Sequence, residues 1–160
     1  MRRSRRLHAP WIKPPPYRAL LRHSKTRVSY LVRLRASHEL VGVVNVSEIV
    51  RGAFCSAYLG YYAFAPHQHS GLMTECLRLV IAQAFGPLRL HRVEANIQPG
   101  NTASRRLVRR LGFRREGYSP RYLKVGGRWR DHERWALLAD EYNRRACPPS
   151  TSSRRSTARK

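Results

Sequence analysis

The apolar positions of this 160-residue chain follow two different periods. Apolar residues at every second position predict strands, and apolar residues spaced three and four apart predict amphipathic helices. The alternating pattern predicts three strands before the first helix, over Val28–Ala36, Leu40–Val50 and Ala57–Ala65. The chain therefore begins its ordered part with a run of consecutive strands.

A helical period then begins at Leu72 and continues to Ala84, where Gly86 and Pro87 end it. A short strand over Val93–Ile97 follows this helix. The change of period at these points predicts a strand, a helix and a second strand in direct succession.

A second helix is predicted after Asn101, whose side chain is suited to the N-cap position. Its inner face carries Leu107, Val108 and Leu111, and Gly112 supplies the residue that ends it. The helix is short, and charged residues surround its apolar face.

Two long strands close the pattern, over Phe113–Lys124 and Trp129–Leu138. Gly126 and Gly127 lie between them and favour a tight hairpin turn. The full order is strand, strand, strand, helix, strand, helix, strand, strand. This order predicts an α/β domain built around a mixed sheet.

The composition divides the chain into one globular domain with two basic ends. The length suggests a single domain, and 42% hydrophobic residues are enough to build its core. Residues 1–16 form a basic, proline-rich segment, residues 17–143 form the domain, and residues 144–160 form a basic tail that is predicted to be disordered.

The formal net charge is +23, and 28 arginines stand against four lysines. Such a charge attracts polyanions, which include nucleic acid, the ribosome and CoA. An arginine-rich composition is also typical of a GC-rich genome. The charge is therefore explained either by contact with RNA or by the composition of the genome.

The three cysteines, Cys55, Cys76 and Cys147, lack the spacing of metal ligands. Neither a metal nor a disulfide framework is predicted, and a reducing compartment fits best. No apolar run reaches transmembrane length, and the basic N-terminus lacks the apolar segment of a signal peptide. A cytoplasmic protein is therefore expected, with no membrane partner.

The stretch PHQHSGLM, at Pro66–Met73, joins the third predicted strand to the first helix. A short polar loop before a helix presents unpaired N–H groups and the positive end of the helix dipole to an anion. Ser70 can cap the helix and donate to an oxygen, and Gly71 lets the backbone approach a ligand closely. The loop is a candidate phosphate site, with an ordinary turn as the alternative.

Several motifs occur in register along the chain: EIVRGAF, YLGY, GLM at the helix start, HRVEANIQPGN, LGF followed by EGY, and GGRWRDH. Through them, about residues 28–142 resemble the GNAT N-acetyltransferases. The similarity is greatest to the RimJ/RimL branch, which acetylates the N-terminal amine of ribosomal proteins. The resemblance implies a GNAT-type mixed sheet flanked by helices, with acetyl-CoA as cosubstrate.

In this family the loop before the first of these helices holds the CoA pyrophosphate through backbone N–H groups. The second glycine of the family pattern is kept at Gly71, and His69 replaces the first. If that position needs a positive φ, a non-glycine residue costs about 1 kcal/mol or more, which a protonated histidine could offset. A degenerate loop that binds weakly is the alternative. The cofactor-binding residues implied by the resemblance are Tyr62, Ala63, Phe64, His67, Gln68, His69, Ser70, Gly71, Leu72 and Asn101.

The resemblance also implies direct transfer of acetyl to the amine, without an acyl-enzyme. Glu94 is the implied general base, and pairing with Arg92 is its alternative role. Ser104 is implied as the proton donor to the CoA thiolate, and an ordinary serine in the first helical turn is its alternative. A backbone N–H near Ala63 and Phe64 would stabilise the tetrahedral intermediate.

The acceptor side is implied by the last hairpin. Asp131 would bind the ammonium of the acceptor and Trp129 would form a wall of its channel, whereas strand pairing and surface charge are the alternative. The segment Leu7–Pro15 looks like the one that caps the peptide site. The usual first strand and helix of the family are not recognised ahead of it, and a missing strand would expose a sheet edge.

The sequence therefore predicts an acetyl-CoA-dependent N-acetyltransferase that acts on a protein N-terminus, with a ribosomal protein as the expected acceptor. A weakened GNAT-fold protein that binds RNA or the ribosome through its basic ends is one alternative. A small-molecule amine acetyltransferase is another. Either a monomer or a dimer fits.

Overall fold

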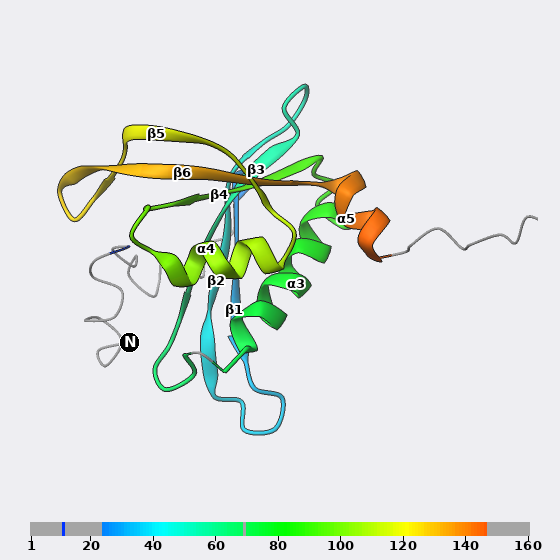
Figure 1. Ribbon diagram of the computed structural model, residues 1–160. Coiled ribbons are helices and arrows are strands. Elements are labelled where there is room, and N and C mark those ends of the chain that lie inside the picture. Colours follow the sequence, from blue (N-terminus) through cyan, green and yellow to red (C-terminus); the bar gives the residue numbers. More distant parts are fainter. Residues whose placement is uncertain (1–10, 12–23, 69, 147–160) are drawn as a thin grey trace, which may run out of the picture.

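In this computed structural model of the chain, the described residues are Trp11, 24–68 and 70–146. They form a six-stranded mixed sheet with three helices (Figure 1). The elements are β1 (Arg27–Arg33), β2 (Leu40–Val50), β3 (Ser56–Ala63), α3 (Leu72–Phe85), β4 (Arg92–Ile97), α4 (Thr102–Arg110), β5 (Arg114–Val125), β6 (Arg128–Leu138) and α5 (Ala139–Ala146).

The predicted order of strands and helices is confirmed, and the larger differences are the ends of β1 and β3 and the additional helix α5. β1 ends at Arg33 instead of Ala36, because the chain turns there: Leu34 N–H donates to the Glu39 carbonyl at 2.9 Å. β3 ends at Ala63, where the turn at Ala65 and Pro66 begins.

Helix α5 was not predicted, and it continues to Ala146, past the residue at which the disordered tail was expected to start. Asp140 and Glu141 lie in its first turn, where carboxylates favour the helix dipole. Two other expectations fall on residues outside the described part: the proline-rich segment apart from Trp11, and the missing first strand and helix.

The strand order across the sheet is β1-β2-β3-β4-β6-β5. Only β3 and β4 run parallel, whereas the other neighbours are antiparallel. The connection between the two parallel strands carries α3, as a parallel pair requires. Gly126 and Gly127, with φ of 58° and 84°, form the predicted hairpin turn between β5 and β6.

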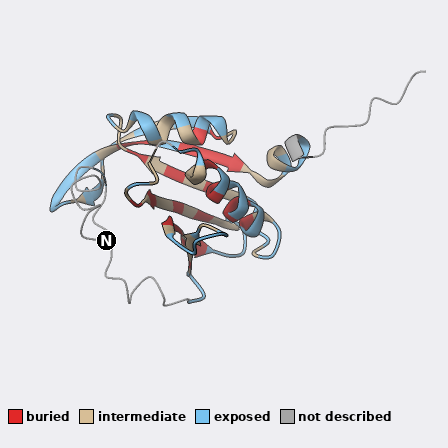
Figure 2. Cartoon of the chain, turned by 90° about the horizontal axis from the view of Figure 1, so that it is seen from below, coloured by how far each residue is buried: buried red, intermediate tan, exposed pale blue. Residues whose placement is uncertain are grey.

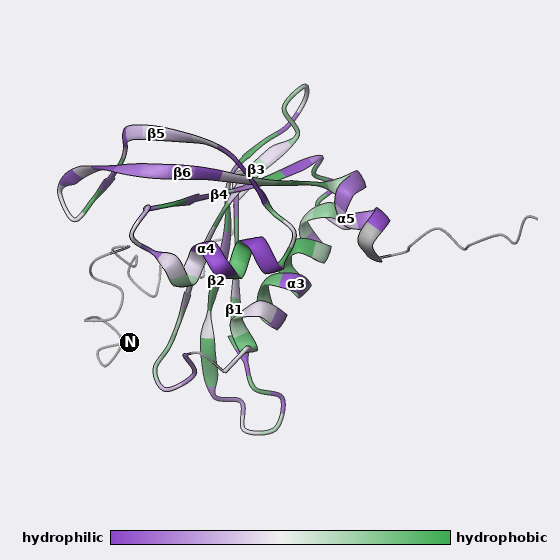
Figure 3. Cartoon of the chain, in the orientation of Figure 1, coloured by the Kyte–Doolittle hydropathy of each residue, from purple (hydrophilic) through white to green (hydrophobic). Residues whose placement is uncertain are grey.

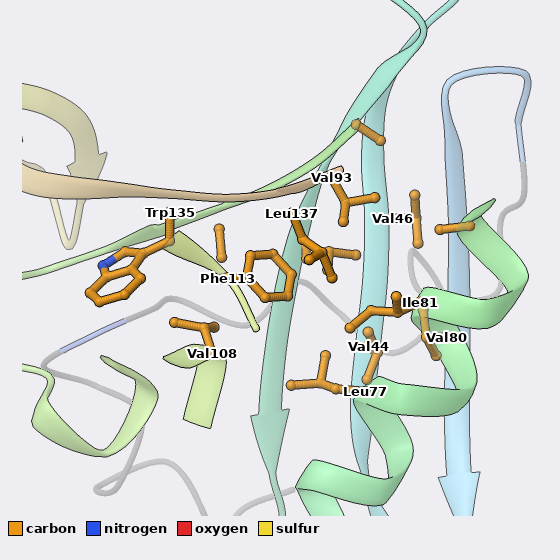
Figure 4. Packing of buried hydrophobic residues seen from close by; sticks show 14 of the residues in the cluster. Val44, Val46, Leu77, Val80, Ile81, Val93, Val108, Phe113, Trp135 and Leu137 are labelled. Atoms are coloured by element: carbon orange, nitrogen blue, oxygen red, sulfur yellow. The ribbon is translucent and has the colours of Figure 1, made fainter. Parts of the chain in front are cut away.

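The main core lies between the sheet and helices α3 and α4 (Figures 2 and 4). Leu77 and Ile81 of α3 are each 1% exposed and meet Val44 and Val46 of β2. At the other end of the core, Val108 of α4 packs beside Phe113 and Trp135 (Figure 4). The predicted apolar faces of both helices are therefore the faces that are buried.

Alternation along the strands assigns residues near the site to one of two faces. The helix face, defined by Leu59 and Tyr61 of β3 and Ala95 and Ile97 of β4, packs toward α3 and α4. The opposite face carries the residues between them. Gly42 also lies on the helix face, since a Cβ there would stand 2.6 Å from Met73 of α3.

Hydropathy separates the two halves of the sheet. The strands β1 and β2 are mostly apolar, whereas the hairpin of β5 and β6 extends outward with mainly hydrophilic residues (Figure 3). Of the helices in the described part, none combines the length and the apolar character that a membrane span needs.

Candidate active site

The two parallel strands pair over only three residues and then separate. The register runs from Ser56 opposite Arg92 to Tyr58 opposite Glu94, and beyond it β3 and β4 diverge (Figure 1). A small cavity of about 90 Å³ lies in the opening. Its lining residues are Trp11, Leu59, Gly60, Tyr61, Ala95, Asn96, Ile97, Gln98, Asn101, Ser104 and His132.

This cavity has contributions from both faces of the sheet. Tyr61 on the helix face and Asn101 and Ser104 of α4 line one side. Gly60 and Asn96 belong to the opposite face, because each lies between two residues of the helix face. The opening between the strands therefore joins the two faces of the sheet.

The backbone of β3 presents polar groups to this opening. Phe64 N–H donates to the Val41 carbonyl of β2 at 2.7 Å, so it is not available as a donor to a tetrahedral intermediate. That part of the prediction is wrong. Because antiparallel hydrogen bonds alternate along a strand, Ala63 and Tyr61 direct their N–H groups away from β2, toward the opening.

The candidate phosphate loop ends in a glycine with a left-handed backbone conformation. Gly71 has φ of 81° and occupies the N-cap position of α3, ahead of Leu72. The prediction that Ser70 caps the helix is wrong, since its Oγ donates to the His67 carbonyl at 2.8 Å. The first N–H groups of α3 have no partner within the helix.

The other loop residues are only partly accessible. His67 Nε2 lies 3.3 Å from Glu39 Oε1, so an acidic side chain of the β1–β2 turn approaches the loop. Gln68 is half-buried, and His69 lies outside the described residues. The cofactor-binding roles of these residues stay predictions.

Tyr62, Ala63 and Phe64 lead into this loop. The Tyr62 ring meets Phe64 edge-on at 5.7 Å, and both side chains are buried with Val43 on the face opposite the helices. Any contact of this segment with a cofactor would therefore be made by its backbone, and Ala63 offers the N–H group that is aimed at the opening.

The start of α4 combines the predicted cap with a phenol that sequence reasoning missed. Asn101 Oδ1 accepts the N–H of Ser104 at 3.1 Å, which confirms the N-cap. The Ser104 hydroxyl lies beside the Tyr61 hydroxyl. Burial raises the pKa of Tyr61 to about 12, and the Ser104 hydroxyl opposes part of that rise. Both hydroxyls are thus protonated at neutral pH.

Glu94 is engaged by Arg92, the alternative that the sequence left open. Arg92 Nε donates to Glu94 Oε1 at 2.9 Å, and the same guanidinium binds Glu116. The Arg92 hydrogen bond holds the pKa of Glu116 below its ordinary value. Glu94 does not line the cavity, where Asn96, two residues further along β4, lies instead.

Asp131 is used inside the last hairpin. Tyr118 Oη donates to Asp131 Oδ2 at 2.5 Å, and Arg121 N–H donates to Oδ1 at 2.7 Å. These two hydrogen bonds, the phenol's above all, hold the pKa of Asp131 below its ordinary value. They fix a bulge of β5 between Ser119 and Leu123.

Trp129 is 60% exposed and lies outside the cavity lining. The structure therefore does not bring Trp129 and Asp131 into the cavity. Trp11 does line it, and its carbonyl accepts from Gln98 Nε2 at 3.1 Å. Trp11 is the described residue of the segment that was expected to cap the peptide site.

His132 is the last residue of the motif GGRWRDH, and the sequence predicted no role for it. The side chain is 3% exposed overall, lines the cavity, and lies 6.2 Å from the Tyr122 ring. Strand alternation was a signal for His132, because it places the side chain on the face of β6 opposite to that of Asp131 and Trp129. Gly60 had a signal too, since a glycine inside a strand often marks a close approach.

In the described part of the chain, no group of His, Cys, Asp and Glu is placed to hold a metal ion. The cavity instead offers hydroxyl, amide and imidazole groups, together with the N–H groups of a diverging strand. Such groups can position a carbonyl, stabilise an oxyanion and exchange protons.

Comparison with known proteins agrees with this geometry. Residues 3–114 match the family described as acetyltransferase (GNAT) domain. The chain is 42% identical over 104 residues to the [ribosomal protein uS5]-alanine N-acetyltransferase of Escherichia coli, covering 65% of this chain and 54% of that protein. It is 41% identical over 99 residues to the probable N-acetyltransferase YjcK of Bacillus subtilis, covering 62% and 55%.

Among solved structures, Mycobacterium smegmatis RimJ in complex with CoA-disulfide superimposes with a TM-score of 0.76 at 30% identity. The match covers 86% of this chain and 73% of that protein. The matched region spans about half the length of the two curated relatives.

Proposed function

The chain belongs to the acetyltransferase (GNAT) domain family, and on that premise we propose that it transfers acetyl from acetyl-CoA to the N-terminal amine of a protein, with a ribosomal protein as the acceptor. The observation that carries this proposal is the cavity between β3 and β4. It lies between the phosphate-loop candidate at the start of α3 and the capped start of α4.

The helix face is the side from which acetyl-CoA would enter. Helix α3 packs on this face, so its N-terminus and Gly71 lie on the same side as Asn101 and Ser104. A pyrophosphate at the loop would direct the pantetheine chain along the opening between the strands. The thioester would then reach the cavity beside Tyr61 and Ser104.

The chemistry needs an oxyanion donor and a proton for the departing sulfur. The N–H groups of Tyr61 and Ala63 point toward the opening and suit the oxyanion, which a single donor stabilises by roughly 3 kcal/mol in comparable sites. The Ser104 hydroxyl, next to the Tyr61 phenol, would give a proton to the thiolate.

Two further observations support a protein acceptor. The E. coli relative is named for acting on an alanine of protein uS5. The net charge of +23 favours approach to ribosomal RNA and disfavours polycationic small amines.

Acetyl-CoA is expected to raise the melting temperature of the purified chain. Ligand at about 100 times its dissociation constant adds roughly 2.7 kcal/mol, which is a rise of roughly 5–11 °C for a chain of this size. The measurement is a thermal melt with acetyl-CoA and, as a control, with an equal concentration of acetate. A cooperative melt that acetyl-CoA leaves unmoved would contradict the proposal.

Acceptor assays then separate the candidate functions. Acetylation of a peptide that begins with alanine or serine, with the same peptide carrying a blocked N-terminus as control, supports the proposal. Acetylation of a polyamine alone would make the protein a small-molecule acetyltransferase. Salt-sensitive RNA binding without a response to acetyl-CoA would favour the non-catalytic alternative.

A further inference from the structure

We propose that His132 is the base that removes a proton from the acceptor's ammonium group. The inference rests on the proposed function, because it names the proton acceptor of that reaction. It starts from a requirement of the chemistry: an α-amino group with a pKa of about 7.7–8.0 is mostly protonated at neutral pH and cannot attack until it loses a proton.

His132 lies on the acceptor side of the cavity. Glu133, the next residue of β6, is opposite Ile97 on the helix face, and its carboxylate reaches Arg105 of α4 at 3.0 Å. Because side chains alternate along a strand, His132 belongs to the opposite face. The phosphate loop and Ser104 lie on the helix face, so the amine would enter from the side of His132.

The hydrogen bonding of the ring defines its tautomer. His132 Nδ1 lies 2.9 Å from the Arg130 carbonyl, and a carbonyl oxygen only accepts, so Nδ1 carries the proton. In the neutral ring Nε2 is then the acceptor. A base held in this way keeps its orientation when Nε2 gains a proton, since the bond from Nδ1 remains.

The surroundings of the ring keep it neutral. The dominant effect is burial, which lowers the pKa of His132 below its ordinary value of 6.5, while the Arg130 carbonyl and Asp131 oppose the shift. The titratable groups that face the ring are Asp131 of its own strand, Tyr122 of β5, and Tyr61 of β3, which shares the cavity lining. Tyr58, with Glu94 and Arg134 near it, contacts Tyr122. The polar groups that α4 adds, Asn101 and Ser104, are uncharged.

Protons and bonds balance with this assignment. Nε2 takes one proton from the ammonium, and the neutral amine attacks the thioester carbonyl to form the C–N bond. The intermediate collapses with cleavage of the C–S bond, Ser104 gives its proton to the thiolate, and the second proton of the nitrogen replaces the one that Ser104 gave. The imidazolium then returns its proton to solvent, so the net products are the amide, CoA thiol and one proton.

Glu94, the base implied by the resemblance, is placed differently. Its Oε1 already accepts from Arg92, and its side chain is absent from the cavity lining. His132 is at the cavity itself and has no cationic partner at Nε2 among the described residues.

The test is the pH dependence of peptide acetylation by the wild type and the His132→Asn variant. Asparagine can still donate to the Arg130 carbonyl but offers no acceptor at the position of Nε2. The variant should lose about 30-fold in kcat/KM at pH 6.5, because only about 3% of an amine with a pKa of about 8 is neutral there. The matched control is His91→Asn, which makes the same change at an exposed histidine just before β4 and should keep the wild-type profile.

The sign of the pH effect distinguishes a base from a structural residue. Wild-type kcat/KM should fall only below pH 6.5, where His132 gains a proton, whereas the variant should depend on the free neutral amine. The ratio of wild-type to variant kcat/KM should therefore fall about tenfold per pH unit up to the pKa of the amine, about 8, and approach 1 above pH 9. Added imidazole should restore part of the loss.

Two outcomes overturn the assignment separately from the function. The assignment is wrong if His132→Asn shows the same fall of kcat/KM at low pH as the wild type. It is also wrong if Glu94→Gln, and not His132→Asn, changes that fall. Acetylation itself would stand in both cases. The melting shift with acetyl-CoA should persist in His132→Asn, which shows that the variant is folded. A wild-type chain that acetylates no amine overturns the function and this inference together.

Discussion

Replacing Trp135 with alanine is expected to lower the free energy of unfolding by about 3–5 kcal/mol. The indole is 2% exposed and packs with Val108 and Phe113 (Figure 4). Its Nε1 donates to Glu133 at 3.1 Å, and Arg109 lies over the ring at 5.7 Å. The substitution removes the packing and leaves a buried carboxylate with one donor fewer, so both effects have the same sign.

The measurement is urea denaturation, and the chain offers a matched control. Trp129 lies on the same strand but is 60% exposed, so Trp129→Ala should change stability by less than about 0.5 kcal/mol. A loss of 3–5 kcal/mol is a large share of the 5–15 kcal/mol typical of a domain. Equal losses in the two variants would contradict the packing described for this end of the core.

Replacing Gly60 with leucine is expected to abolish acetylation while leaving the fold intact. A Cβ at Gly60 would meet nothing within 4 Å, and its φ lies outside the left-handed region, so the sheet can accept a side chain there. The side chain would fill the cavity from the acceptor face, next to Asn96. Displacing the amine by even 1 Å reduces the rate about 100-fold, and leucine should reduce it at least as much.

Two readouts test this expectation. The melting temperature should stay within a few degrees of the wild type, and the shift with acetyl-CoA should persist, because the cofactor would enter from the helix face. Gly60→Ala should show an intermediate loss of activity. Leucine that lowers stability like a core defect, or that leaves peptide acetylation unchanged, would show that Gly60 does not border the acceptor path.

The arrangement of elements was predictable because their periods are distinct along the chain. The apolar spacing from Leu72 onward and the turn at Gly126 required no tertiary information, and both agree with the structure. Helix α5 was not predicted, because its eight residues are mostly polar and contribute little apolar spacing. Its packing depends on a contact from elsewhere in the fold, that of Tyr142 with Phe85, with ring centroids 5.4 Å apart.

The candidate site was predictable only where a residue acts through its own local segment. Asn101 caps its own helix, as its type and position predicted. His132 and Tyr61 could not be placed in this way, because their proximity depends on where β3 separates from β4. Asp131 was assigned from its charge, whereas its partners lie across the hairpin, at Tyr118 and Arg121.

The opening between β3 and β4 would let the two substrates bind and leave independently of each other. Because acetyl-CoA and the amine would approach from opposite faces, neither lies in the exit path of the other, and both can be present at once. Initial-rate plots against one substrate at several fixed levels of the other should therefore intersect. A tethered inhibitor that joins the two substrates would have to be threaded through the gap, so such a compound should bind slowly and leave slowly.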